Sequence, residues 1–137
     1  MVFFDLPVGW SLLGFLMMHI TCGVFLSLVF QSAHVVPTSE FPLPNDNGVI
    51  ENNWAIHQLL TTANFSPKSR IFSWFIGGLN YQIEHHLFSN ISHVHYRKLS
   101  AIVKETAAEF NLPYHSQGNF FHAVASHLQM LKQLGRA

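Results

Sequence analysis

The stretch Gly77-Gly-Leu-Asn-Tyr-Gln-Ile-Glu-His-His-Leu-Phe88 places three side chains with lone pairs close together in the chain. On a helix, Gln82, His85 and His86 stand at positions i, i+3 and i+4, so their side chains leave from one face. Imidazole suits iron, zinc, copper and nickel, and the spacing alone does not choose among these metals. A bare His-His pair is more often solvated or hydrogen-bonded at a helix end. The preceding Gln and Gly-Gly and the following Leu-Phe favour metal binding here.

The composition indicates a chain adapted to a membrane or to a deeply buried environment. Only 10% of its 137 residues are charged, whereas 49% are hydrophobic; ordinary soluble domains carry about 25% charged residues. The net charge is zero with His neutral, which argues against nucleic acid as a partner. The single cysteine, Cys22, excludes an internal disulfide and a cluster of thiolate ligands for zinc. Ten histidines instead favour nitrogen and oxygen ligands for any metal.

An apolar run near the N-terminus predicts a transmembrane helix over about residues 6–31. No charged residue occurs between Leu6 and Phe30, and about 20 apolar residues suffice to cross the hydrocarbon core of a bilayer. His34 follows at the membrane-exit end, where it is either a metal ligand or a polar cap of the helix. The residues themselves leave both roles open. Basic residues occur only from Lys68 onward, which favours a cytoplasmic C-terminal part.

Residues 32–137 are expected to form a helical region that contains the metal-binding stretch and a cap. Its proline-rich start is predicted as a loop, and strand signals are weak throughout. The spacing of apolar residues predicts helices over residues 53–63, 96–110 and 120–134, and a buried or interfacial segment over residues 71–79. Asn53 is expected to cap the first of these helices, and Asn111 and Pro113 are expected to end the second. The expected fold class is therefore all-α: an integral membrane helical protein with a cytosolic helical cap.

The metal-binding stretch, followed by Asn90-Ile-Ser-His-Val-His-Tyr96, resembles the third histidine box of membrane fatty acid desaturases. The likeness is to bacterial acyl-lipid or acyl-CoA desaturases and to front-end desaturases, whose third box begins with Gln. It covers nearly the whole chain, although Ser89 stands where the family usually has Pro. It also includes Phe30-Gln-Ser-Ala-His34, Trp54-Ala-Ile-His-Gln58, Thr61-Thr-Ala-Asn-Phe65 and Asn111-Leu-Pro-Tyr114.

The resemblance implies a di-iron centre held almost wholly by histidine. His85 and His86 match ligands of the third box, and Gln82 matches the first ligand position of that box. His34 matches a lone histidine at the end of the preceding membrane helix, itself a ligand. This match shifts the balance for His34 from a polar cap toward a metal ligand.

Other histidines and one carboxylate receive supporting roles. His57 matches a position that varies between relatives and is expected to be polar or to support a ligand. Glu84 is expected to face away from the ligands and to orient an imidazole. The remaining C-terminal histidines are expected in solvated, hydrogen-bonded or capping positions: His93, His95, His115, His122 and His127.

The resemblance further implies an enzyme that introduces a double bond into an acyl chain, with O2 as co-substrate. Removing two hydrogens from an unactivated alkyl chain needs an oxidant that no side chain can supply, so a metal must carry that step. The implied partners are a fatty acyl substrate on coenzyme A or on a lipid, an external electron donor (ferredoxin or a b-type cytochrome) and the membrane. The metal site and the C-terminus are expected on the cytoplasmic side.

The first and second histidine boxes of the family, His-x3–4-His and His-x2-His-His, normally lie upstream of the third and are not found there. Four candidate ligands are too few to hold two irons. The chain is therefore expected to be the C-terminal portion of a desaturase and to be incomplete alone. Two alternatives are a non-catalytic truncated membrane remnant and a related di-iron hydroxylase.

Overall fold

The computed structural model describes residues 7–136, most of which are helical. The predominance of helix agrees with the all-α prediction, to which the structure adds two short strands that pair in parallel, β1 (Asn64–Phe65) and β2 (Ser116–Gln117). Strands of two residues are too short to show the alternation of polar and apolar residues by which strands are predicted. The helices are α1 (Val8–His34), α2 (Trp54–Thr61), α3 (Arg70–Phe75), α4 (Gln82–Leu87), α5 (Tyr96–Glu109) and α6 (Phe120–Leu134), with a 3-10 turn, η1 (His93–His95).

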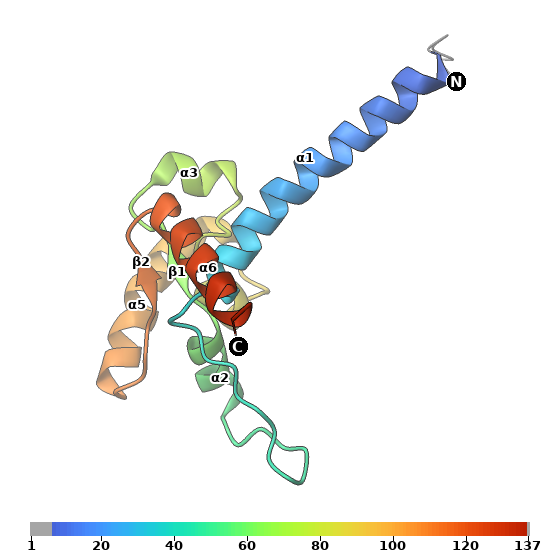
Figure 1. Cartoon of the computed structure of the whole chain (residues 1–137). Coiled ribbons are helices and arrows are strands. Elements are labelled where there is room, and N and C mark those ends of the chain that lie inside the picture. Colours follow the sequence, from blue (N-terminus) through green and yellow to red (C-terminus); the bar gives the residue numbers. More distant parts are fainter. Residues whose placement is uncertain (1–6, 137) are drawn as a thin grey trace.

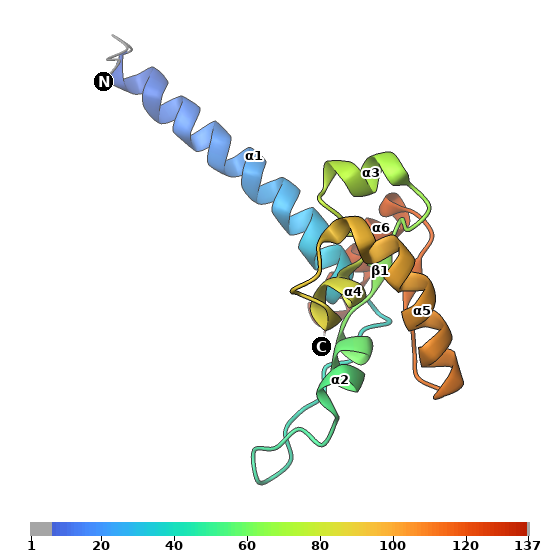
Figure 2. The same ribbon diagram turned by 180° about the vertical axis from the view of Figure 1, so that it is seen from behind.

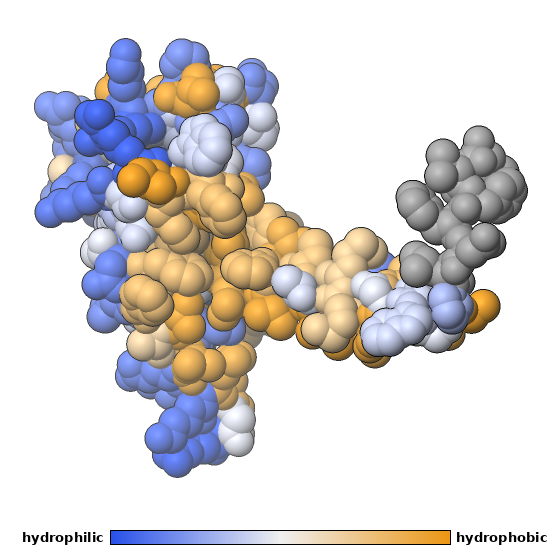
Figure 3. Space-filling model, turned by 90° about the horizontal axis from the view of Figure 1, so that it is seen from above, coloured by the Kyte–Doolittle hydropathy of each residue, from blue (hydrophilic) through white to orange (hydrophobic). Residues whose placement is uncertain are grey.

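Helix α1 projects from the rest of the chain as a straight rod (Figures 1 and 2). Among the described residues, it is the one helix long and apolar enough to cross a bilayer. Its 27 residues correspond to a length of about 40 Å at 1.5 Å per residue. The helix continues to His34, beyond the predicted end at residue 31, and the predicted start at residue 6 lies outside the described residues. Figure 3 shows that hydrophobic residues cover α1 and continue onto the adjoining part of the body.

The C-terminal end of α1 is the part that enters the body, where Val29, Ser32 and Ala33 are buried. The Ala33 carbonyl accepts a hydrogen bond of 2.8 Å from the Ala63 amide, which ties the end of α1 to the segment before β1. His127 of α6 donates from Nδ1 to the Val35 carbonyl at 2.9 Å. These two bonds fix where α1 ends, and with it the position of His34.

Strand β1 lies between two hydrophobic clusters. Successive side chains of a strand point to opposite sides. Phe65 is fully buried against α1 and α6, with its ring centroid 5.9 Å from that of Phe120 and 6.1 Å from that of Phe72. Asn64 forms its hydrogen bond to Ile83 on the other side of the strand. There α2, α4 and α5 meet around Leu59, Ile83, Val103 and Ala107.

Several local predictions are confirmed by the backbone. Asn53 caps α2, because its side-chain oxygen accepts a 3.0 Å hydrogen bond from the Ala55 amide. Asn111 ends α5 in a left-handed conformation with φ of 53°. The apolar segment predicted over residues 71–79 forms only the six-residue α3 and then turns through Gly77 and Gly78.

This glycine turn leads the chain into α4. Gly77 and Gly78 both adopt positive φ, of 62° and 75°, which costs other residues about 1–2 kcal/mol. The two glycines differ in the space available for a side chain. A Cβ on Gly78 would lie 2.9 Å from Cβ of His93 in η1, whereas a Cβ on Gly77 would meet nothing within 4 Å.

Gly78→Ala should therefore destabilise the chain more than Gly77→Ala, by about 1–3 kcal/mol, because it adds overpacking to the same backbone strain. The measurement is denaturant unfolding of both variants in the same detergent. Equal losses for the two variants would show that the Gly78–His93 approach is not a tight contact.

Candidate metal centre

Helix α4 carries the three predicted ligands of the histidine box on one helical turn. It begins at Gln82 after the turn at Tyr81. Gln82 is buried, with 1% of its surface exposed, while His85 and His86 are half-buried. The chain therefore presents two imidazoles at the rim of the body and an amide behind them.

His34, at the end of α1, comes close to this pair. The centroids of the His34 and His86 rings are 5.0 Å apart, and those of His85 and His86 are 5.8 Å apart. Two of these rings leave α4 and the third leaves the last residue of α1. The fold thus brings together three of the four predicted ligands as neighbouring rings.

Both histidines of α4 are held through Nδ1. His86 Nδ1 lies 2.8 Å from the amide oxygen Oε1 of Gln58 in α2. An amide oxygen only accepts hydrogen bonds, so Nδ1 carries the proton and Nε2 keeps its lone pair for a metal. His85 Nδ1 lies 3.3 Å from the hydroxyl of Tyr96, the first residue of α5. We had not predicted roles for Gln58 and Tyr96, because only the tertiary contact reveals them.

Burial keeps His86 neutral. The pKa of His86 falls to about 4, first because burial penalises the charged ring and then because His34 and His85 are nearby. At neutral pH the ring is therefore uncharged, which is the form that binds metals. Half-burial at the rim thus prepares a ligand without any charged partner.

Gln82 provides a further test of whether the site suits a metal. Neither its Oε1 nor its Nε2 has a hydrogen-bond partner within residues 7–136, although both atoms are buried. A buried amide without partners is costly, and an amide oxygen on the same helical turn as two imidazoles adds an oxygen donor to a nitrogen set that iron accepts. No group of three or more His, Cys, Asp or Glu residues in the described part of the chain could hold a metal ion by itself. The residues present fit part of a metal centre.

His57 and Glu84, which were expected to support the ligands, differ in their hydrogen bonding. His57 lies on α2, half-buried, and its Nδ1 has no hydrogen-bond partner among the residues that the structure describes. Glu84 is completely buried, and its two oxygens accept hydrogen bonds from Asn64 Nδ2 at 2.8 Å and from the Tyr114 hydroxyl at 2.9 Å. The sequence predicts that Glu84 orients an imidazole. The structure differs, because the carboxylate binds an amide and a phenol.

These contacts form an Asn64 network, which consists of Asn64, Glu84, Ser100 and Tyr114. Asn64 Nδ2 lies 2.7 Å from the Tyr114 hydroxyl, and this hydroxyl lies 2.9 Å from Ser100 Oγ. Burial raises the pKa of Glu84 and of Tyr114. Burial thus works against a charge on either group, while the hydrogen bonds from Asn64 and Tyr114 lower the pKa of Glu84 in part.

The same network sets the position of α4. Asn64 Oδ1 accepts a 2.9 Å hydrogen bond from the backbone amide of Ile83. The first amides of a helix have no partner within the helix, so this bond acts as a cap delivered from β1. Asn64 therefore fixes the start of the turn from which His85 and His86 project.

The histidines outside the box lie apart from the ring group. His93 and His95 are exposed in η1, and His122 is exposed on α6. His127 is buried and is therefore not a surface residue, but its bond to the carbonyl of Val35, the C-cap residue of α1, agrees with the predicted capping role. His122 and His127 also have a His-x4-His spacing. One points to solvent and the other holds the end of α1, so this pair does not act as a ligand box.

We expect Asn64→Ala to destabilise the fold by about 2–4 kcal/mol, because it leaves the buried Ile83 amide without its acceptor and removes one hydrogen bond each from Glu84 and Tyr114. Denaturant unfolding in detergent measures the loss. Asn47→Ala is the matched control, since that side chain is exposed in the loop before α2, and it should change stability by less than about 0.5 kcal/mol. A loss of control size for Asn64→Ala would contradict the role of the network.

The metal-free chain should show a low titration midpoint for His86. Nuclear magnetic resonance of the histidine ring carbons, assigned with His86→Gln, should give a midpoint of about 4. The folded ring takes up its proton at a lower pH than the unfolded ring, so His86 costs stability progressively as the pH falls below about 6.5. A midpoint near the ordinary histidine value would show that the ring is solvated.

Comparison with known proteins agrees with this arrangement. Residues 1–118 match the family described as fatty acid desaturase. The chain is 42% identical over 130 residues to an acyl-lipid (8-3)-desaturase of Mortierella alpina, covering 95% of the chain and 29% of that relative. It is 40% identical over 141 residues to an sn-1 linoleoyl-lipid 6-desaturase of Synechocystis sp., covering 98% of the chain and 39% of that relative.

The chain thus spans well under half of the length of these two relatives. No solved structure matches it. The family match covers the end of α1, the Asn64 network up to Tyr114 and the whole of α4. The chain belongs to the fatty acid desaturase family.

Proposed function

We propose that this chain forms the third histidine box and the cap of an integral membrane desaturase that introduces a double bond into a fatty acyl chain. The observation that carries the proposal is the group of rings from His34, His85 and His86 at the C-terminal end of α1, the one helix within residues 7–136 that is suited to cross a bilayer. Family membership supports the reaction type. A membrane-spanning α1 would place these rings just outside the hydrocarbon core.

In this proposal His34, Gln82, His85 and His86 contribute to a di-iron centre that other parts of the enzyme complete. Bound iron supplies, with O2, the oxidising power for removing two hydrogens from an alkyl chain. The chain's own residues hold and orient the ligands. Gln58 keeps Nε2 of His86 free, Tyr96 contacts His85, and the Asn64 network anchors α4.

The relatives also suggest what the enzyme acts on. Two of them are named for acyl-lipid or linoleoyl-lipid substrates, so we infer an acyl group carried on a lipid. Electrons would come from an external donor, a ferredoxin or a b-type cytochrome. With α1 in the membrane, the metal centre and the C-terminal cap would lie together on the cytoplasmic side.

A chimera tests this function directly. The chain replaces the matching C-terminal region of the Synechocystis desaturase, which supplies the upstream part of the enzyme, and the chimera is expressed in a host that lacks the double bond. We expect iron in the purified chimera and a new unsaturated fatty acid by mass spectrometry. A hydroxylated product would assign the related hydroxylase instead. The absence of both iron and product would contradict the proposal.

Two variants of the chimera make the ligand role specific. His86→Ala should abolish the double bond, a loss of at least about 100-fold, because a ligand is removed from the metal centre. His122→Ala is the matched control and should leave the product level unchanged, since His122 is exposed on α6. Unchanged unsaturation in the His86 variant would remove the basis for the metal centre.

A further inference from the structure

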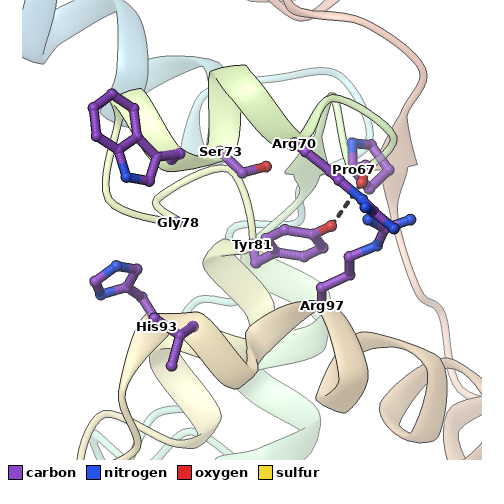
Figure 4. A pocket seen from close by; sticks show the side chains of 9 residues that line it. Pro67, Arg70, Ser73, Gly78, Tyr81, His93 and Arg97 are labelled. Carbon is purple, nitrogen blue, oxygen red and sulfur yellow. Dashed lines mark hydrogen bonds between the residues drawn. The ribbon is translucent and has the colours of Figure 1, made fainter.

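We propose that a pocket beside α3 binds the phosphate group of a membrane phospholipid. This arginine pocket is lined chiefly by Arg70, Ser73, Trp74, Tyr81, His93 and Arg97, and lies between α3, the glycine turn, η1 and the start of α5 (Figure 4). It is separate from the ring group, and none of the four candidate ligands lines it. The proposal rests on the proposed function only in placing α1 and α3 at a membrane.

The charge of the pocket calls for an anion. Its lining residues include two arginines and a histidine and, among the described residues, no aspartate or glutamate. Figure 4 shows Arg70 and Arg97 extending from opposite sides toward the Tyr81 hydroxyl and Pro67. Two guanidinium groups facing one cavity repel each other, and an anion between them relieves this repulsion. The planar fork of donors on each arginine matches the oxygens of a phosphate.

The pocket walls are held in place before any ligand arrives. Tyr81 is 3% exposed and donates a 2.6 Å hydrogen bond from its hydroxyl to the Pro67 carbonyl. Ser73 Oγ donates to the Ser69 carbonyl at 2.8 Å, which ties α3 to the residues before it. Gly78 brings the turn against His93, as its missing Cβ allows. A preformed site loses less entropy on binding than a mobile one.

The size of the pocket suits a phosphate with one substituent. Its volume is about 240 Å³, whereas a water molecule occupies about 30 Å³ of the liquid. A phosphoryl group can therefore enter together with the start of a glycerol or an alcohol. A long headgroup would extend into solvent past the exposed residues Arg70, His93 and Val94.

The surroundings of the pocket favour a lipid over a soluble phosphate. Helix α3 exposes Ile71, Trp74 and Phe75 by 84%, 80% and 74%, and tryptophan is typical of membrane interfaces. Phe75 and Ile76 also line an apolar groove against Phe25, Leu26 and Val29 of α1. A phospholipid would place its phosphate between the arginines and its acyl chains along α3 and α1, whereas inorganic phosphate would use only the first part.

The fluorescence of Trp74, which lines the pocket, measures binding in the full chain purified in a nonionic maltoside. Trp10 and Trp54 are replaced by Phe so that Trp74 alone reports. The probes are dihexanoyl phosphatidic acid, dihexanoylglycerol, inorganic phosphate and coenzyme A. We expect the phosphatidic acid to bind at least about tenfold more tightly than the diacylglycerol, because only the phosphatidic acid offers phosphate oxygens for charge-assisted hydrogen bonds from the arginines.

Arg70→Gln combined with Arg97→Gln should weaken phosphatidic acid binding by about tenfold or more. The matched control, Lys104→Gln with Lys132→Gln, removes the same charge from exposed positions outside the pocket and should leave binding unchanged. The double Lys variant, Arg70→Lys with Arg97→Lys, keeps the charge and should bind with intermediate affinity. It also provides the comparison if the glutamine variant does not fold.

Each outcome decides the proposal. Equal affinities for phosphatidic acid and diacylglycerol would overturn it. So would an equal loss of binding in the variant with Arg70→Gln and Arg97→Gln and in the control with Lys104→Gln and Lys132→Gln. Inorganic phosphate or coenzyme A binding as tightly as phosphatidic acid would overturn the lipid assignment and leave a site for soluble phosphate. The assay needs neither iron nor turnover, so binding without desaturase activity, or activity without binding, would separate this proposal from the proposed function.

Discussion

The hydrogen bonds of Asn64 are the constraint on which the metal-binding part of this structure depends. One buried side chain accepts from the Ile83 amide and donates to Glu84, and its amide also lies beside the Tyr114 hydroxyl. Asn64 lies in β1, and its partners come from α4 and from the segment after α5, which are distant from β1 in sequence. Without this connection, a helix of six residues such as α4 would have little to define its position, because short helices are not stable alone.

The two residues of β1 face different hydrophobic clusters. Phe65 fills the cluster that anchors α1 and α6, and Asn64 satisfies the polar side that faces α4. Since side chains alternate along a strand, one extended dipeptide can connect both. The end of α1, which carries His34, and the start of α4, which carries the other rings, are therefore positioned by adjacent residues.

Burial, and not a network of ions, prepares the candidate metal centre. The pKa of His86 falls and the pKa of Glu84 rises for the same reason, the loss of water around each group. Both side chains thus favour their neutral forms inside the chain. The charged groups lie elsewhere, notably as Arg70 and Arg97 beside α3, both of which are exposed to solvent.

Much of the local structure could be predicted from the sequence, because it depends on neighbours in the chain. The long apolar helix, the Asn53 cap, the end of α5 at Asn111 and the placement of Gln82, His85 and His86 on one turn follow from composition and spacing. The family likeness was equally visible in those residues. What the sequence did not reveal were the paired strands, the buried role of His127 and the true partners of Glu84.

The tertiary structure alone decided how the predicted pieces meet. Gln58 and Tyr96 became supports of the histidine rings only because α2 and α5 pack on α4. Arg70 and Arg97 became one pocket only because the glycine turn brings α3 against η1. The physical reason is the range of the forces involved. Helix propensity, capping and hydrophobic period act over a few residues of chain, whereas hydrogen bonds and burial between distant segments depend on the complete packing.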